Sequence, residues 1–264
     1  PSILKRLYPT LPVVASKAGA YLAAFYKKGL ADTDKYYFSH IPRMATATMV
    51  KTFYSPETKD KLDGYAAESA FGRDLPDNFM KWHHLSRAQY LEARSLLAGY
   101  ILSSQGDRVS AANSIEGRFP FLDHRLAEFA ATVPPWHKIL GLNEKFILKK
   151  AMRPELPANI LDRVKQPYMA PDSNSFVQEN HPEYVDEMLS EETLGRYGLF
   201  NPGPVTRLRK KCTRLAHKHL SFRDNMSFIS ILSTQLLIHH YLENFRAAEP
   251  LDRSRFKIWH DATA

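Results

Sequence analysis

The spacing of apolar residues predicts a chain made almost entirely of helices. The segment 86–102 (SRAQYLEARSLLAGYIL) gives the clearest amphipathic pattern, and Ser86 stands where an N-cap is expected. The apolar positions of this segment recur at helical spacing: Tyr90, Ala93, Leu97 and Ile101. Residues 12–29 form a second amphipathic pattern that ends at Gly29, a residue type favoured just after a helix. Both segments are therefore expected to be helices.

Two further helices are predicted from their first residues. Ser55 precedes PETKDKL, which offers a capping hydroxyl, a proline at the first helical position and an acid in the first turn. Asp123 precedes a helix that Pro134-Pro135 should end. The apolar stripe of that second helix consists of Leu126, Phe129, Ala130 and Val133. We therefore expect Asp123 to be a helix cap.

The rest of the chain continues the helical pattern. Further helices are expected at 144–153, 157–163, 181–190, 204–220 and 222–246. YYFSHI (36–41) is a weak candidate for a strand, and a loop rich in Pro, Asp, Ser and Asn (167–175) separates two helical regions. The fold class that follows is mostly α.

Composition narrows the class of protein. The 264 residues are 44% hydrophobic, which is typical of a globular chain with a sizeable core. Cys212 is the only cysteine, so no internal disulfide can form, and a reducing, cytoplasmic location is expected. No uninterrupted apolar run is long enough to span a membrane. The net charge of +8 leaves a polyanionic partner open.

Two groups of residues that suggest ligand binding have simpler explanations. The segment 207–220 carries a basic stripe formed by Arg207, Lys211, Arg214 and Lys218. This stripe is either a polyanion site or, as we favour, a solvated face opposite Leu208, Leu215 and Ala216. The histidine pairs 83–84, 217/219 and 239–240 lack the spacing of four that suits chelation on a helix. Surface or interface packing is the preferred interpretation of these pairs.

The segment 103–126 (SSQGDRVSAANSIEGRFPFLDHRL) is unusually rich in paired charges. Asp107 with Arg108, and Glu116 with Arg118, are either ion pairs that fix a loop or parts of a site. LDRVKQPYMAPD (161–172) adds two cations, Arg163 and Lys165, before a proline-rich loop. A lysine held there is suited to meet phosphate as a compact point charge.

Three strings in order resemble a known family. QGDRVSAANSIEGRFPFLDHRL, NEKFILKKAMRPELP and RVKQPYMAPD resemble the C-terminal synthetase domain of glutamine-dependent asparagine synthetases and of relatives such as β-lactam synthetase. The resemblance is sharpest over 85–172. It implies that 1–246 is the C-terminal portion of the synthetase domain and that 247–264 is a tail. The implied fold is the helical C-terminal part of an α/β adenine nucleotide α-hydrolase-like (ATP pyrophosphatase) domain.

The resemblance also implies a reaction. A carboxylate, with aspartate as the expected substrate, attacks ATP to give an acyl-adenylate and pyrophosphate, and ammonia from an N-terminal glutaminase domain then displaces AMP. Mg²⁺ would accompany ATP, with its ligands outside this chain. The family's SGGxDS phosphate loop and GEGADE acidic segment are absent from the sequence, so the chain alone is expected to be inactive. The resemblance is also compatible with a homodimer, and it implies neither nucleic-acid nor membrane partners.

Individual residues acquire roles through the same resemblance. Lys165 matches the lysine near the α-phosphate and the departing pyrophosphate, where it would be catalytic, and Arg163 would help to bind phosphate. Glu116 and Arg118 match the acyl-substrate side, where an acid and a base can bracket a zwitterion. Asp107 and Arg108 would lie beside the same cleft.

Two alternative functions remain open at this point. Leu102 and Gln105 stand where better-known members carry an acid and a base associated with aspartate recognition. A first alternative is therefore an amidotransferase or cyclising synthetase that acts on another carboxylic acid. A second alternative is a non-catalytic helical module whose basic stripe contacts a polyanion, which salt-dependent nucleic-acid binding would reveal.

Overall fold

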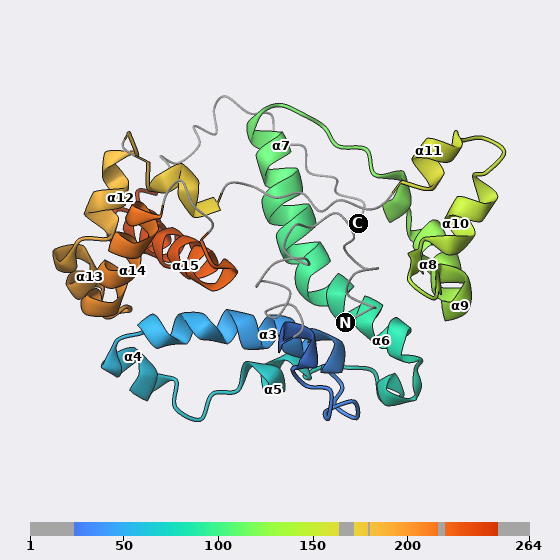
Figure 1. Ribbon diagram of the computed structural model, residues 1–264, viewed down its shortest axis with the longest axis horizontal. Helices are drawn as coiled ribbons and strands as arrows, with labels where there is room; N and C mark the ends of the chain where they lie inside the picture. Colours follow the sequence, from blue (N-terminus) through green and yellow to red (C-terminus); the bar gives the residue numbers. More distant parts are fainter. Residues whose placement is uncertain (1–23, 164–171, 179, 216–219, 248–264) are drawn as a thin grey trace, which may run out of the picture. The chain divides into compact units, whose positions relative to one another are not determined.

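The computed structural model describes residues 24–163, 172–178, 180–215 and 220–247 and shows a mostly helical protein (Figure 1). The chain divides into two compact units. Unit 1 comprises residues 1–48 and 64–169, and unit 2 comprises residues 49–63 and 170–264. Lys165 and the residues before position 24 lie outside the described residues, so the roles assigned to them stay predictions.

Unit 1 contains one long helix and a series of short helical elements. Its helical elements are η2 (Phe38–His40), α3 (Ile41–Ala47), α5 (Ala67–Phe71), η4 (Phe79–Lys81), α6 (His84–Glu92), η5 (Ala93–Asp107), α7 (Arg108–Ala112), η6 (Pro120–Leu122), α8 (His124–Thr132), α9 (Pro135–Lys138), α10 (Phe146–Ala151) and α11 (Ala158–Leu161). Strands β1 (Ile139–Leu140) and β2 (Asn143–Glu144) pair antiparallel, with Ile139 opposite Glu144. Among the described residues, this hairpin is the only sheet.

The long helix of unit 1 runs without a break through α6, η5 and α7, as Figure 1 shows. Its central part, η5, is a π-helix, which winds more residues into each turn than an α-helix does. Side-chain bonds follow the same spacing, since Ser104 Oγ donates to Gly99 O at 3.0 Å and Gln105 Nε2 donates to Tyr100 Oη at 2.8 Å. A helix over 86–102 is therefore confirmed, but the wider winding changes which side chains share a face.

Two details of the prediction for this helix are wrong. The N-cap is His83, whose Nδ1 accepts from Leu85 N at 3.1 Å, so the helix begins two residues before Ser86. The expected apolar stripe is not buried as a unit, because Ala93 and Ile101 are exposed while the neighbouring Leu91 is fully buried. Residues spaced for an α-helix of 3.6 residues per turn do not share one face of a π-helix, in which backbone hydrogen bonds join residues five apart.

The core of unit 1 lies at the start of the long helix. Phe79 and Leu91 are buried there. The Phe79 ring lies 5.3 Å from Trp82 and 5.7 Å from Tyr90 between centroids, within the range of favourable aromatic pairs. His40 is also buried, and its Nε2 lies 3.0 Å from Glu92 Oε2. Contacts made by α6 therefore hold the N-terminal part of unit 1 together.

The expected strand at 36–41 is wrong, because this stretch forms η2 and the start of α3. Successive turn bonds run from Lys35 N to Asp32 O at 3.0 Å and from Phe38 N to Lys35 O at 3.1 Å. Backbone groups that are already satisfied within the segment have no need of a partner strand. The predicted end near Gly29 is confirmed, since helical residues 24–27 stop just before this glycine, whose φ is 75°.

Unit 2 is a helical bundle with a continuous core. Its elements are most of η3 (Thr48–Phe53), α4 (Pro56–Lys61), η7 (Asp172–Phe176), α12 (Glu183–Met188), α13 (Glu191–Tyr197), α14 (Pro202–Arg214), α15 (Phe222–Ile238) and η8 (His239–Glu243). Buried apolar residues from these elements form one cluster: Val177, Val185, Met188, Leu189, Leu194, Phe200, Val205, Leu208, Cys212, Phe228, Ile231 and Leu232. The predicted helices at 181–190, 204–220 and 222–246 are confirmed, although α14 already ends at Arg214.

The segment carrying α4 joins unit 2 through its cap. Ser55 Oγ accepts from Thr58 N at 3.1 Å, which confirms the predicted N-cap, and it donates to Gly198 O at 2.7 Å. Ser55 N also donates to Leu199 O at 3.0 Å. One buried serine therefore caps a helix and ties it to the turn after α13.

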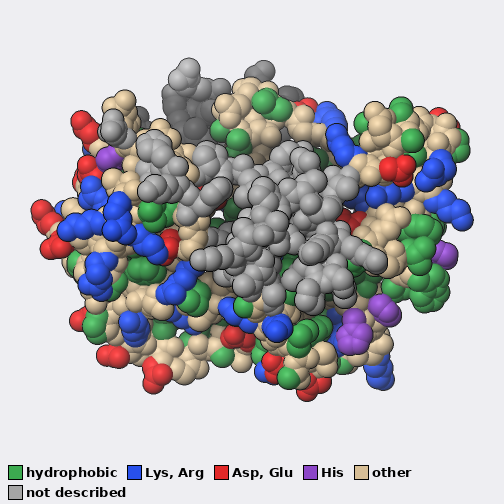
Figure 2. Space-filling view, viewed as in Figure 1, with side chains coloured by type: hydrophobic (Ala, Val, Ile, Leu, Met, Phe, Trp, Pro, Cys, Tyr) green, Lys and Arg blue, Asp and Glu red, His purple; other side chains and the backbone are tan. Residues whose placement is uncertain are grey.

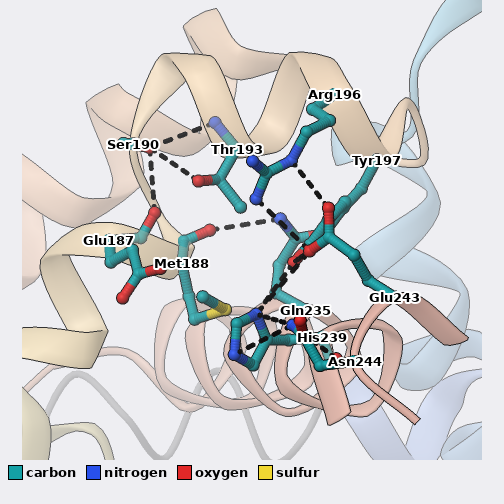
Figure 3. A network of polar contacts seen from close by, with 10 residues as sticks. All are labelled: Glu187, Met188, Ser190, Thr193, Arg196, Tyr197, Gln235, His239, Glu243 and Asn244. Carbon is teal, nitrogen blue, oxygen red and sulfur yellow. Dashed lines mark hydrogen bonds and ion pairs between the residues drawn. The ribbon is translucent and has the colours of Figure 1, made fainter. Parts of the chain in front are cut away.

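A polar network fastens α13 to η8, as Figure 3 shows. Glu243 accepts from Arg196, with Nε 3.1 Å from Oε1, and from the Tyr197 hydroxyl at 2.5 Å. Tyr197 Oη also lies 3.1 Å from His239 Nδ1. Beneath this network, the fully buried Gln235 donates from Nε2 to Met188 O at 3.1 Å. Among the described residues, Gln235 Oε1 has no hydrogen-bond partner, but the bonds that Glu243, Arg196, Tyr197 and His239 make with one another join α13 to η8 as a structural clamp.

The basic stripe on α14 is in part paired internally. Within the stripe, Lys211 Nζ lies 2.6 Å from Asp224 Oδ2, Arg207 and Arg214 are exposed, and Lys218 lies outside the described residues. Arg209, which is on α14 but not in the stripe, pairs with Asp186. The opposite face of α14 is apolar and buried through Val205, Leu208 and Cys212. Lysine and arginine side chains gather over this part of the surface in Figure 2. The arrangement supports a solvated basic face rather than a polyanion groove.

Candidate active site

The candidate active site is the stretch that follows the long helix. Helix α7 ends with Ser114 in the left-handed conformation, at φ 56°, while Ile115 N donates back to Ser110 O at 2.8 Å. This pattern is a Schellman-type helix end, which turns the chain sharply out of the helix. The residues of the EGR string therefore emerge as an irregular segment rather than as more helix.

Glu116 and Arg118 lie in direct contact on this segment. Arg118 Nη1 is 2.6 Å from Glu116 Oε1. The Arg118 side chain is 73% exposed and the Glu116 side chain is 80% exposed. Gly117 lies between them, and a side chain at this position would have to displace the Phe119 ring. The structure thus presents a carboxylate and a guanidinium together, both open to solvent.

Asp107 and Arg108 lie at the junction of η5 and α7, and both are exposed. Within the described ranges, no ion pair links Asp107 to Arg108 or either of them to Glu116 and Arg118. The ion-pair interpretation of this segment therefore holds for Glu116 with Arg118 only. The remaining two charged groups are free to meet a ligand.

Asp123 caps α8 as predicted. Its Oδ1 accepts from Arg125 N at 2.9 Å, and its carboxylate also receives both Nε and Nη2 of Arg125, the latter at 2.8 Å. The Arg125 side chain and backbone bonds hold the pKa of the Asp123 carboxyl below its usual value of 3.8. The role of Arg125 as a clamp on the cap was not foreseen from the sequence, although a basic residue two positions after an N-cap is a readable signal.

The apolar face of α8 and the helices after it are open to solvent. Phe129 of α8 is 65% exposed and Trp136 of α9 61%, and none of the residues of α8, α9 and α10 is buried. Phe121 of η6, just before α8, is 70% exposed. Figure 2 shows hydrophobic side chains at the surface on the side where these helices lie in Figure 1. The predicted stripe of α8 is thus present but has no cover among the described residues.

Of the two residues predicted to bind phosphate, the structure describes one. Arg163 follows α11 and is exposed, while Lys165 lies outside the described residues. The part of the chain that the structure describes contains no group of three or more His, Cys, Asp or Glu side chains that could hold a metal ion. The described residues therefore supply exposed cations suited to phosphate but no carboxylate cage suited to Mg²⁺.

Neither of two other features adds a site. No helix among the described residues is both long and apolar enough to cross a bilayer. Cys212 is fully buried, and burial raises the pKa of its thiol to about 11. A thiol in this environment stays protonated and is a poor nucleophile.

Comparison with curated proteins finds relatives of two kinds. The amidase chyE of Penicillium rubens is 37% identical, over 39% of this chain and 18% of its own length. The amidase chry2 of Gibberella zeae is 28% identical, over 60% of this chain and 25% of its own length. A glutamine-hydrolysing asparagine synthetase of Bacillus subtilis, number 3, is 41% identical, over 32% of this chain and 12% of its own length.

These alignments span at most a quarter of the length of the three relatives. No solved structure matches the chain. The family model described as asparagine synthase, however, matches residues 8–240, which covers nearly the whole sequence and both units. That range includes the irregular segment with Glu116 and Arg118 and the capped helix after it. The chain belongs to the asparagine synthase family.

Proposed function

We propose that this chain is the C-terminal helical part of an ATP-dependent carbon–nitrogen ligase that activates a carboxylate as an acyl-adenylate. The observation that carries the proposal is the family match over residues 8–240 together with the exposed Glu116–Arg118 pair inside it. Aspartate amidation with glutamine-derived ammonia is the specific reaction we favour. Asparagine synthetases among the relatives support this choice.

The Glu116–Arg118 pair suits a zwitterionic substrate. An amino acid brings an ammonium group and a carboxylate, which can replace the two partners of the existing ion pair. Since both side chains are more than two-thirds exposed, the pair contributes little to stability, and opening it costs little. Glu116 would then receive the ammonium and Arg118 the carboxylate, leaving the second carboxylate of aspartate free to react.

Phosphate-directed cations complete the proposal. When the substrate carboxylate attacks the α-phosphorus of ATP, negative charge accumulates on the phosphoryl oxygens, and a fixed cation stabilises it most at that moment. We assign this role to Lys165, with Arg163 and Arg108 as further phosphate contacts. Mg²⁺, when bound with ATP, supplies additional charge neutralisation, and we place its protein ligands outside this chain.

A second candidate function is amidation or cyclisation of a different carboxylic acid. Two relatives bear the name amidase, and one of them aligns with 60% of this chain. Gln105 and Tyr100 also form a neutral hydrogen-bonded pair at 2.8 Å on the exposed surface of η5. A neutral pair on this helix suits a substrate with an uncharged polar group. Product analysis with aspartate and with other carboxylic acids separates the two reactions.

The proposal is tested by pyrophosphate release from ATP in the complete protein that contains this chain. Lys165→Ala should lower turnover by at least about a hundredfold, the scale of losing one preorganised electrostatic contact. The matched control is Lys59→Ala, which removes an exposed lysine from α4 in unit 2. Near-normal pyrophosphate release by Lys165→Ala would remove the assigned role. Release with no dependence on any carboxylic acid would contradict the proposed reaction itself.

A further inference from the structure

Arg87 is a nearly buried cation without a carboxylate. Its side chain lies in the first turn of α6, and the residue is only 7% exposed. Nη1 donates to Met80 Sδ at 3.3 Å, and Nη2 donates to His84 Nδ1 at 2.6 Å. Among the described residues, no acidic side chain pairs with it. Neither partner of this guanidinium is a carboxylate.

This arrangement is energetically unfavourable as it stands. Arginine keeps its charge at every physiological pH, and a buried charge is costly unless an opposite charge accompanies it. A thioether is a weak acceptor, and an imidazole nitrogen brings no negative charge. More exposed arginines of the chain do have carboxylates, namely Arg43, Arg94, Arg125, Arg196 and Arg209. Arg87, the most deeply buried arginine among the described residues, thus lacks the anion that these more exposed arginines have.

The surrounding helix turn adds to the positive potential. Helix α6 has nine residues, and its first turn contains no acid that would offset the positive end of the helix dipole. Backbone N–H groups of a first helical turn are natural donors to an anion, and in α6 that of Leu85 is already bonded to His83 Nδ1, which leaves its neighbours as donors. His83 and His84 are exposed and Met80 is 49% exposed, so the Arg87 head group lies next to solvent-accessible side chains.

We propose that Arg87, His84 and the first turn of α6 form a binding site for a phosphate group. The guanidinium fork matches two oxygens of a tetrahedral oxyanion. Further donors from the helix turn and from the exposed imidazoles can reach the remaining oxygens, which a carboxylate with two oxygens would leave unused. The bound anion supplies the charge that the buried guanidinium lacks.

This site is separate from the candidate active site. Arg87 and Asp107 are twenty residues apart along one continuous helix, which corresponds to a distance on the order of 20–30 Å. None of Asp107, Arg108, Glu116, Arg118 and Arg163 contacts Arg87 or His84 among the contacts of the described residues. The proposal therefore stands independently of the reaction that the family membership suggests. Its ligand is free phosphate or a phosphate group on a small molecule.

The experiment compares thermal unfolding and calorimetric binding of the full chain in inorganic phosphate, AMP and sodium chloride at equal ionic strength. For the unaltered chain, we expect a Tm that rises and saturates with phosphate but not with chloride. A response to AMP alone would show that the phosphate group must be carried by a larger molecule. Absence of any response to either phosphate source would overturn the proposal.

Three variants show whether Arg87 is the receptor. Arg87→Leu should lose the phosphate response while keeping a Tm at least as high as that of the unaltered chain without phosphate, because it removes an uncompensated buried charge. Arg87→Lys keeps the charge but loses the fork, and should bind phosphate roughly tenfold more weakly. Arg94→Leu, which removes an arginine already paired with Asp74, should leave the phosphate response unchanged.

The variants also exclude a purely structural role. If Arg87 only packs and bonds to its neighbours, Arg87→Leu lowers the Tm sharply and Arg87→Lys keeps an unchanged phosphate response. A phosphate response that persists in Arg87→Lys at full strength, or that disappears in Arg94→Leu, places the anion elsewhere and overturns the assignment. Should Arg87→Leu fail to fold, the comparison of Arg87→Lys with Arg94→Leu still decides the question.

Discussion

The bundle of unit 2 and the motif-bearing stretch of unit 1 from 108 to 160 use their apolar residues in opposite ways. Unit 2 buries a continuous cluster that includes Leu194, Cys212 and Phe228 at no more than 1% exposure. This stretch, which carries most of the first two family strings, has no buried residue in α7, α8, α9 or α10. Stability is therefore concentrated in the part with the fewest recognisable motifs, and candidate chemistry in the part that buries least.

This difference explains why the most recognisable residues of the sequence are not residues of the hydrophobic core. Asp107, Arg108, Glu116 and Arg118 are all exposed, so their presence is not required by the core. Exposed polar residues that sit together without a structural need are the usual material of binding sites. In unit 2, by contrast, buried polar groups such as Ser55 and Gln235 are bonded to backbone carbonyls and act in the fold.

The largest expected effect compares a buried and an exposed apolar side chain. Leu194→Ala should lower the free energy of unfolding by roughly 2–5 kcal/mol, because it leaves a cavity at a fully buried site. Phe129→Ala, at a residue 65% exposed, should cost less than about 1 kcal/mol in this chain. Denaturant unfolding of the two variants measures both values. Equal losses would mean that the face of α8 is buried and that the two regions do not differ in this way.

The second effect concerns substrate binding and should leave stability untouched. Glu116→Gln and Arg118→Gln should each raise the apparent KM for the carboxylic acid substrate of the complete protein by roughly tenfold to a hundredfold, the worth of one charged hydrogen bond. The KM for ATP and the Tm should change little, because both side chains are exposed. Glu128→Gln on α8 is the matched control.

Other outcomes of this experiment have clear meanings. If the KM for ATP rises instead, the pair faces the nucleotide. If either variant unfolds, the Glu116–Arg118 contact is a structural ion pair, and the exposed stretch depends on it for its conformation.

Helix caps show how much of the fold could be read from the sequence. Ser55 and Asp123 were predicted as caps because a short acceptor side chain before a helix has few other roles, and both are confirmed. The cap of α6 was missed because His83 is an uncommon capping residue. The π-helical winding of η5 was missed because it changes backbone pairing without any change in composition.

The candidate site was predictable in part for the same reason. Local signals placed Glu116 and Arg118 two residues apart, and the structure brings them into contact. The burial of Arg87 carries no such signal, since it depends on Met80 and on residues that pack around α6. Burial arises from tertiary packing, which the helical pattern of one segment does not encode.

The third effect is smaller and tests a cap in the exposed stretch. Asp123→Ala should lower the Tm of unit 1 by roughly 2–4 °C, because the first turn of α8 loses the acceptor for Arg125 N. Asp123→Asn and Asp123→Ser keep an acceptor and should be nearly silent, since the exposed pair with Arg125 contributes little. A loss of pyrophosphate release in Asp123→Asn at unchanged Tm would instead make Asp123 part of the reaction.

The smallest expected effect is that mild acid changes the folding stability of the two units in opposite directions. In unit 1, burial lowers the pKa of His40 below 6.5, although Glu92 at 3.0 Å pulls it upward and Arg43 adds to the lowering. In unit 2, the hydrogen bond with Asp186 raises the pKa of His181 above 6.5. A histidine with a lowered folded pKa resists protonation, so unit 1 should lose stability as the pH falls below about 6.5. A histidine with a raised folded pKa contributes stability that is fully present below 6.5 and is lost as the pH rises through its folded pKa, so mild acid should favour unit 2. Glu92 does not titrate in this pH range, because its pKa lies below 4.5: burial raises this pKa, but the interactions with Arg43 and His40 together lower it by more.

Hydrogen exchange at the amides of Leu91 and Leu194, corrected for the intrinsic effect of pH, reports the two units separately. His40→Gln should flatten the response of Leu91 only, and His181→Gln that of Leu194 only. Parallel changes at both amides would show that the units unfold as one body, and the contrast between them would then be one of local burial without independent stability.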